Sequence, residues 1–164
     1  MKKYEFTGET KRVELWNRTA TLHRIKATVE FGFVKVGELG GWIEKEENLS
    51  HEGKAWVWGN AKVCGDAKVW GNAKVCGDAK VCGDAEVFLA SHVLVMGSVG
   101  SRNDFTTFFR DKDNEITVKC GCFLGKIDKF LEKVTQTHGN NKYALVYRAA
   151  VEVAKLQIEL TERK

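Results

Sequence analysis

Residues 57–87 read V-W-G-N-A-K, V-C-G-D-A-K, V-W-G-N-A-K, V-C-G-D-A-K, V-C-G-D-A-E and V without a gap, so the chain repeats every six residues. Valine holds the first position of each repeat and alanine the fifth. A period of six keeps no apolar stripe on an α-helix, whereas positions one and five lie on the same face of a strand. Glycine at position three and Asn or Asp at position four enter turn conformations at low cost. The pattern therefore predicts short strands separated by tight corners.

These repeats are similar to those of the left-handed hexapeptide-repeat family, in which three six-residue sides make a triangular coil of eighteen residues. The resemblance implies a short left-handed parallel β-helix over residues 51–98, in which residues eighteen positions apart stack. At about 4.8 Å per rung, this coil is only about 10–15 Å tall. So short a solenoid needs caps, and we expect it to have partners.

The segments on either side of the repeat have other patterns. Residues 1–50 contain short alternating stretches that predict an N-terminal β cap. Trp42 is expected to close the open end of the coil, and Leu49 is expected in the register of Ala55. Residues 99–164 predict a β-hairpin, formed by 105–110 and 115–119, and then two amphipathic helices over 127–138 and 141–158. The expected fold is mainly β, with a β cap before the coil and a hairpin plus two-helix module after it.

Composition narrows the function classes. The 26 basic and 22 acidic residues give a net charge of +4, spread too evenly along the chain to predict a nucleic-acid surface. The sequence has no signal-peptide pattern and no apolar run long enough for a membrane span, so we expect a cytoplasmic protein with no membrane partner. The odd number of cysteines, five, favours free thiols over a disulfide framework.

Outward positions two and six of the repeat carry large apolar side chains. The residues expected at an oligomer interface are Trp56, Trp70 and Phe88 on one wall and Trp58 and Leu94 on another. Such walls exceed what a soluble monomer usually exposes, so they predict a homo-oligomer, and the resemblance to the hexapeptide-repeat family implies a trimer. The alternative is that the cap segments fold back over the walls.

Hexapeptide-repeat proteins include trimeric acyltransferases that use a histidine as general base, and the resemblance makes His92 the candidate here. His92 is expected at an outward position beside the tryptophan-rich wall, but no catalytic motif surrounds it. The alternative is an ordinary surface histidine. We therefore favour a protein without catalytic activity.

The cysteines also invite a metal interpretation. Cys64, Cys76 and Cys82 lie in the repeat without a nearby histidine, and Cys120 and Cys122 with His138 offer at most three ligands. Zinc normally takes four. We interpret the repeat cysteines as outward apolar substituents and expect neither a metal nor a cofactor.

The stretch S-R-N-D-F-T-T-F-F-R at residues 101–110 directly follows the repeat and combines charge, hydroxyls and aromatic rings. Such a set suits an anionic, ring-containing ligand, because Arg pairs with phosphate and Phe stacks on a base. The expected ligand-binding residues are Arg102, Asn103, Asp104, Thr106, Thr107, Phe108 and Arg110, with Tyr147 and Arg148 closing the pocket. The alternative is a capping turn in which Arg102 pairs with Asp104.

Four stretches together resemble hexapeptide-repeat proteins encoded by bacteriophages and prophages: L-H-R-I-K-A, G-E-L-G-G-W-I-E-K-E-E-N-L-S, the V-x-G-[ND]-A repeats and G-S-R-N-D-F-T-T-F-F-R. The resemblance covers nearly the whole chain. It implies an accessory anti-defence protein in the host bacterial cytoplasm, which sequesters a nucleotide signal such as a cyclic oligonucleotide or an ADP-ribose derivative between subunits. An acyltransferase and a protein-binding inhibitor or assembly protein stay open as alternatives.

Overall fold

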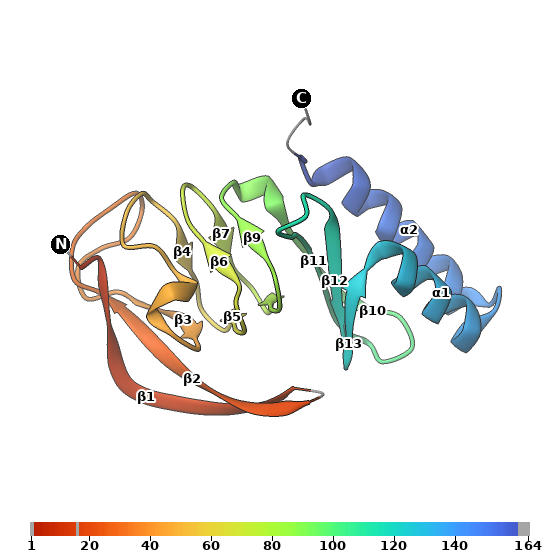
Figure 1. Cartoon of the computed structure of the whole chain (residues 1–164), viewed down its shortest axis with the longest axis horizontal. Coiled ribbons are helices and arrows are strands. Elements are labelled where there is room, and N and C mark those ends of the chain that lie inside the picture. Colours follow the sequence, from red (N-terminus) through yellow and green to blue (C-terminus); the bar gives the residue numbers. More distant parts are fainter. Residues whose placement is uncertain (1, 16, 161–164) are drawn as a thin grey trace.

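The computed structural model describes residues 2–15 and 17–160. The chain passes from a long N-terminal hairpin through a central coil of very short strands to an antiparallel sheet and two helices (Figure 1). This architecture confirms the coarser prediction of a mainly β fold with two C-terminal helices. Each of these parts of the fold corresponds to a segment of the sequence with its own local pattern.

Parallel strand pairs form the central coil. The strands are β4 (Trp56–Val57), β5 (Lys62–Val63), β6 (Lys68–Val69), β7 (Lys74–Val75), β8 (Lys80–Val81) and β9 (Glu86–Val87). Strand β4 pairs with β7, β5 with β8 and β6 with β9, and every pair joins residues eighteen positions apart. Residues eighteen positions apart therefore lie side by side in neighbouring turns of the coil, as expected.

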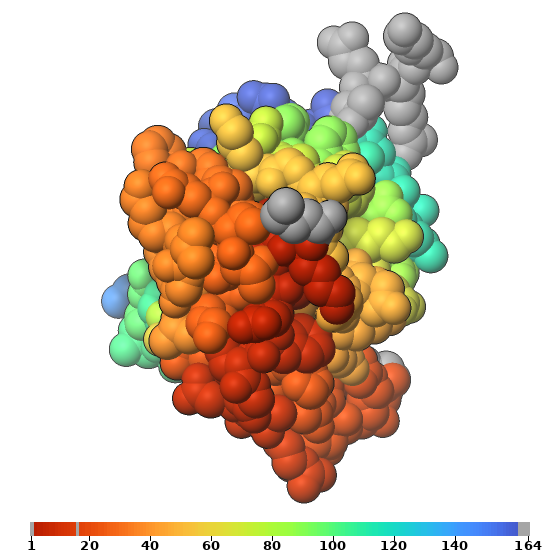
Figure 2. Space-filling model, turned by 90° about the vertical axis from the view of Figure 1, so that its left-hand side faces the viewer, coloured from red at the N-terminus to blue at the C-terminus, as the bar shows by residue number. Residues whose placement is uncertain are grey.

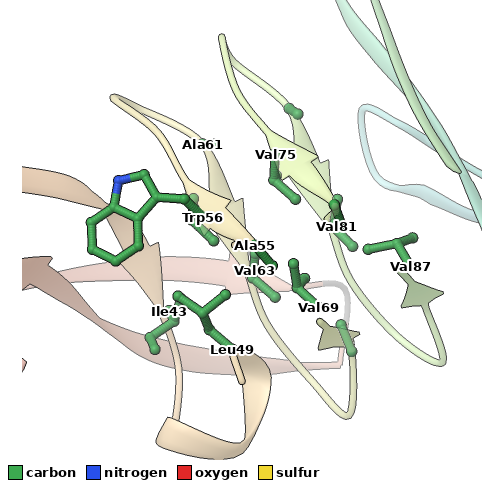
Figure 3. Close-up of a cluster of buried hydrophobic side chains, with 14 of the residues drawn as sticks. Ile43, Leu49, Ala55, Trp56, Ala61, Val63, Val69, Val75, Val81 and Val87 are labelled. Carbon is green, nitrogen blue, oxygen red and sulfur yellow. The ribbon is translucent and has the colours of Figure 1, made fainter. Parts of the chain in front are cut away.

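The valines and alanines of the repeat form the core of the coil. Val57, Val63, Val69, Val75, Val81 and Val87 are all at most 1% exposed, and their side chains stack in the interior (Figure 3). The corners need glycine: Gly71 has φ +62°, and a Cβ there would lie 2.7 Å from the Phe88 carbonyl oxygen. The repeat thus supplies small residues where the chain turns and branched ones where it packs.

The N-terminal segment forms a hairpin and joins the coil through one further strand. Strand β1 (Tyr4–Leu15) pairs antiparallel with β2 (Arg18–Ala27), and β2 pairs with β3 (Leu39–Ile43). Strand β3 then adds in parallel to β5. The hairpin runs along one side of the coil (Figure 1) and projects beyond it in the end-on view (Figure 2).

The first turn of the coil is longer than the later ones. Trp42 pairs with Lys62 and Leu49 with Val69, both twenty positions apart, whereas Val57 pairs with Val75, eighteen positions apart, so the two extra residues lie between Leu49 and β4. The expected register of Leu49 with Ala55 is therefore wrong, since Leu49 takes a valine position. Trp42 does not close the end of the coil either: it faces outward, with the Lys11 ammonium 4.3 Å from its ring centroid.

Parallel stacking ends with β9. Residues beyond it form a four-stranded antiparallel sheet in the described part of the chain, ordered β10 (Val93–Val99), β11 (Asp104–Arg110), β12 (Ile116–Cys120) and β13 (Phe123–Lys126). Helices α1 (Ile127–His138) and α2 (Lys142–Gln157) pack against it. The predicted hairpin and both helices are confirmed, and the last predicted repeat instead supplies the edge strand β10.

The expected wall of Trp56, Trp70 and Phe88 does not exist as one surface. Trp56 precedes its valine, so it pairs with Lys74 rather than stacking beside Trp70. Its indole is 0% exposed and contacts Tyr4 and Phe31 of the N-terminal cap. Figure 3 shows the indole directed away from the valines of the coil.

The other interface candidates are half-buried. Trp70 and Phe88 stack with ring centroids 5.0 Å apart. Trp58 packs against the coil core, and Leu94 packs against the core under the two helices. The alternative of a cap folding back over the coil holds for Trp56, which Tyr4 and Phe31 contact. On a further side of the coil, Ala20 and Leu22 of the hairpin pack against Cys64 and Cys82.

Candidate functional site

The predicted ligand-binding stretch splits into an exposed turn and a buried strand. Arg102, Asn103 and Asp104 are exposed. Asn103 has φ +50° in a turn closed by its hydrogen bond to the Gly100 carbonyl, and the Asp104 carboxylate accepts the Phe105 N–H at 2.7 Å. No ion pair between Arg102 and Asp104 occurs among residues 2–15 and 17–160, so the predicted Arg102–Asp104 pair is absent from this turn.

Thr106, Thr107 and Phe108 are not available to a ligand, which corrects the prediction. All three lie on the inner strand β11 and are at most 1% exposed. The Thr107 hydroxyl accepts the Lys80 N–H at 3.0 Å and so ties the sheet to the coil. The Thr106 hydroxyl donates to Cys120 Sγ, while the Phe108 ring packs against Phe130.

Arg110 and Arg148 are also structural, contrary to the prediction. Arg110 donates from Nη1 to the Glu86 carbonyl at 2.8 Å, and its guanidinium lies 5.0 Å from the Phe88 ring centroid. Arg148 donates to the Gly139 carbonyl at 2.8 Å and to Thr135 Oγ1 at 3.2 Å. These bonds satisfy acceptors at the end of α1.

Arg102 and Tyr147 do line one cavity, whose volume is about 320 Å³. Glycines make room for both side chains. A Cβ at Gly100, which has φ +77°, would lie 1.9 Å from the Tyr147 hydroxyl, and a Cβ at Gly121 would lie 2.5 Å from Arg102 Nη1. The cavity therefore lies where the turn before β11 meets the turn after β12 and the helix pair.

Helix α1 supplies the other side of this cavity. Its lining residues include Phe130, Lys133, Val134, Thr137 and His138. Of these residues, the sequence had pointed only to His138, as an incomplete metal-ligand set with Cys120 and Cys122, which also line the cavity. The spacing of the helix residues puts them on one face of the helix, but nothing in the sequence shows that this face meets the turn at residues 100–103.

Polar contacts connect the two sides of the cavity. Ser101 Oγ lies 3.4 Å from His138 Nε2, and the His138 ring stacks on Tyr147 with centroids 5.9 Å apart. Burial raises the pKa of the Tyr147 phenol, which therefore stays protonated at neutral pH. Two cations, Arg102 and Lys133, thus flank an apolar floor with hydroxyl and imidazole groups at its edge.

His92 is a structural residue rather than an exposed base. It is 1% exposed, and its Nδ1 accepts the N–H groups of Phe88 at 3.1 Å and Leu89 at 3.2 Å. Burial, and then the charge of Arg110, lower the pKa of His92, so the ring stays neutral and keeps accepting. The expectation of an outward His92 is wrong, because the chain turns inward at Ala90–His92.

Residues 2–15 and 17–160 contain no cluster of three or more His, Cys, Asp or Glu side chains able to hold a metal ion. Within the same ranges no helix is both long and apolar enough to cross a membrane. The chain matches no protein-family model, and a search of curated proteins found no match. The function is therefore argued from the cavity itself.

Proposed function

We propose that this protein is a non-catalytic binding protein that holds a small anionic, ring-containing ligand in the cavity lined by Arg102, Lys133, His138 and Tyr147. The observation that carries this proposal is that two cationic residues, Arg102 and Lys133, line the same cavity as several apolar side chains. An Arg guanidinium pairs bidentately with phosphate, and Lys adds a second positive charge. The Phe123 ring at the same cavity offers an aromatic surface to a base.

The size of the cavity bears on the ligand and on the assembly. A volume of about 320 Å³ is at the lower end of the range for small-molecule sites. A cyclic oligonucleotide or an ADP-ribose derivative, which carries more than one base or phosphate, needs additional surface. We therefore propose that a neighbouring subunit of a homo-oligomer completes the site.

Two apolar surfaces support self-association. The half-buried stack of Trp70 and Phe88 is one. The other is the outer face of α2, where Leu145 is 61%, Val153 44% and Leu156 88% exposed. These positions lie opposite the buried face of the helix, so α2 is apolar on two sides, and we propose that the second side faces another subunit of a trimer.

We further propose that the coil is a left-handed parallel β-helix of the hexapeptide type, because its strands pair in parallel at eighteen-residue intervals. The likeness to phage-encoded hexapeptide-repeat proteins extends the proposal to an accessory role in the host cytoplasm. There the protein would sequester a nucleotide signal of host defence. An experimental structure with phased density gives the handedness directly.

The ligand proposal is tested by titration calorimetry and thermal shift against cyclic dinucleotides and ADP-ribose compounds. Arg102→Ala is expected to weaken binding by about tenfold to a hundredfold, as the loss of a charge-assisted hydrogen bond predicts. Arg12→Ala, at an exposed position on the hairpin, is the matched control and should bind as the wild type does. Equal affinity in the wild type and Arg102→Ala would remove this cavity from the proposal.

The exposed face of α2 also favours a second candidate, a protein-binding inhibitor or assembly protein. A stable heteromeric complex that Leu156→Glu abolishes and Arg102→Ala leaves intact would support this function over ligand binding. An acyltransferase reaction through His92 gains no support, because Nδ1 is occupied by the N–H groups of Phe88 and Leu89.

A further inference from the structure

A second set of cations lines the side of the coil that the N-terminal hairpin covers, separated from the cavity just described by the turn at Gly121. Lys62 and Lys80 stand directly opposite each other in the parallel pair β5–β8. Lys80 is in turn linked to strand β11, because the Thr107 hydroxyl accepts the Lys80 N–H. Thr107 pairs across the antiparallel sheet with Lys119 of β12. Three half-buried lysines are thus brought onto one surface from distant parts of the chain.

The arrangement is unfavourable for the protein alone. Like charges directly opposite each other on neighbouring strands destabilise a sheet, whereas opposite charges stabilise it. The corresponding pair in β6–β9 is complementary, since Lys68 faces Glu86. Among residues 2–15 and 17–160 no ion pair joins Lys62, Lys80 or Lys119 to a carboxylate. The repulsion between Lys62 and Lys80 is therefore a feature of one side of the coil.

These lysines line a space large enough for a small anion. Two adjoining cavities, of about 120 and 190 Å³, share Leu15, Cys64, Cys82 and Lys119 in their walls. Lys62 and Lys80 line the first, and the Arg18 side chain lines the second. Glu14 is an acidic residue at the edge of the first cavity. We call this space the lysine groove.

The titration behaviour of the groove agrees with a positive potential. Burial, and then the charges of Lys11 and Lys80, lower the pKa of Lys62, although Asp78 opposes this effect. At the floor, the hydrogen bond from the Cys64 thiol lowers the pKa of Cys82; burial opposes this effect, and the charges of Lys119 and Lys80 add to it.

We propose that the lysine groove is an anion site that takes a phosphate group between Lys62, Lys80 and Lys119. Lysine ammonium groups bind phosphate as compact point charges, and the phosphate would convert the Lys62–Lys80 repulsion into two attractions. The phosphate is either a free ion or the phosphate of a larger molecule that extends along the hairpin. This site uses other cations than the cavity around Arg102, and the turn at Gly121 lies between the two.

The test is titration calorimetry with inorganic phosphate and with a nucleoside monophosphate, with sodium chloride adjusted to hold the ionic strength constant. The double variant Lys62→Gln/Lys80→Gln is expected to lose at least about tenfold in affinity. Lys68→Gln/Lys74→Gln makes the same change of charge on other sides of the coil and should bind as the wild type does. Because the cavity around Arg102 is itself proposed to take phosphate, both double variants and their wild-type reference are titrated in the Arg102→Ala background, where phosphate binding should persist.

Thermal unfolding in phosphate-free, low-salt buffer provides a second measurement. The Lys62→Gln/Lys80→Gln variant should unfold at the wild-type temperature or above it, because the repulsion between adjacent rungs is gone. Binding of inorganic phosphate identifies a free ion, and binding of the monophosphate alone identifies a larger ligand; both support the site. Equal phosphate affinity in the double variant and the wild type, or no saturable binding in the wild type, overturns it.

Discussion

Cys64 and Cys82 lie on neighbouring rungs of the coil with their Sγ atoms 2.8 Å apart, and the N-terminal hairpin covers both side chains. The Cys64 thiol donates a hydrogen bond to the Cys82 sulfur, and this bond, together with burial, raises the pKa of Cys64. Both are free thiols, as are Cys76, Cys120 and Cys122. Two cysteines that were predicted to point outward are therefore a buried pair.

The first prediction concerns the oxidation state of this pair. Protein from freshly lysed cells, alkylated under denaturing conditions, should show five reactive thiols; a lower number would contradict the assignment. Mild oxidation in vitro with diamide should then join Cys64 to Cys82, because side chains on adjacent parallel strands lie within disulfide range. Intact-mass measurement should show the loss of two hydrogen atoms in the wild type and in Cys76→Ser, but not in Cys82→Ser.

The second prediction concerns self-association through the Trp70–Phe88 stack. Trp70→Glu places a charge on a half-buried aromatic surface and should dissociate the proposed oligomer, because burying an unpaired carboxylate is costly. Light scattering after size exclusion measures the mass directly. Gln136→Glu adds the same charge at an exposed position on α1 and should leave the mass unchanged. A Trp70→Glu variant with the wild-type mass would show that the stack lies outside any subunit interface.

The third prediction separates a structural role of His92 from a catalytic one. His92→Ala leaves the N–H groups of Phe88 and Leu89 without an acceptor, so the free energy of unfolding should fall by about 1–3 kcal/mol. His92→Asn keeps a side-chain acceptor and should recover part of this loss. Urea unfolding followed by tryptophan fluorescence measures both variants. Unchanged stability in His92→Ala would contradict the structural role.

The fourth prediction is a pH dependence that originates at Lys3. Lys3 as a whole residue is 3% exposed, and its ammonium group donates to the Ala55 carbonyl at 2.7 Å. Burial lowers the pKa of Lys3 from 10.5 to about 8, so between these two values the unfolded chain binds this proton more tightly than the folded one. The free energy of unfolding should therefore rise across this window by up to about 3 kcal/mol, and it should be lowest below the folded pKa.

Comparison with Lys3→Met isolates this effect from other groups that titrate in the same range. The difference in unfolding free energy between the wild type and Lys3→Met should change between pH 7.5 and pH 9.5 in favour of the wild type. Lys2→Met, at an exposed position paired with Glu46, should follow the wild type across the same range. A difference that stays constant with pH would show that Lys3 titrates normally.

The local elements were predictable because each depends on neighbours in the sequence. The six-residue period sets the strand and corner positions, so the valines and alanines of the coil were correctly placed in its core. The hairpin over β11 and β12 and the two helices follow from alternation and from the spacing of their apolar residues. In these segments the local pattern and the final packing agree.

Side-chain environments that depend on distant segments were not predictable. Nothing near Cys64 in the sequence shows that the hairpin will cover it, and nothing near Trp56 shows that Tyr4 and Phe31 will contact it. Likewise, nothing near Arg102 shows that Lys133 and His138 will line the same cavity. The burial of Thr107 likewise comes from its bond to Lys80 in the coil. The repeat thus determined the coil by itself, whereas the candidate sites formed only when tertiary packing brought separate segments together. The reason is that periodicity specifies which face of a strand or helix a residue occupies, but not which other segment packs against that face.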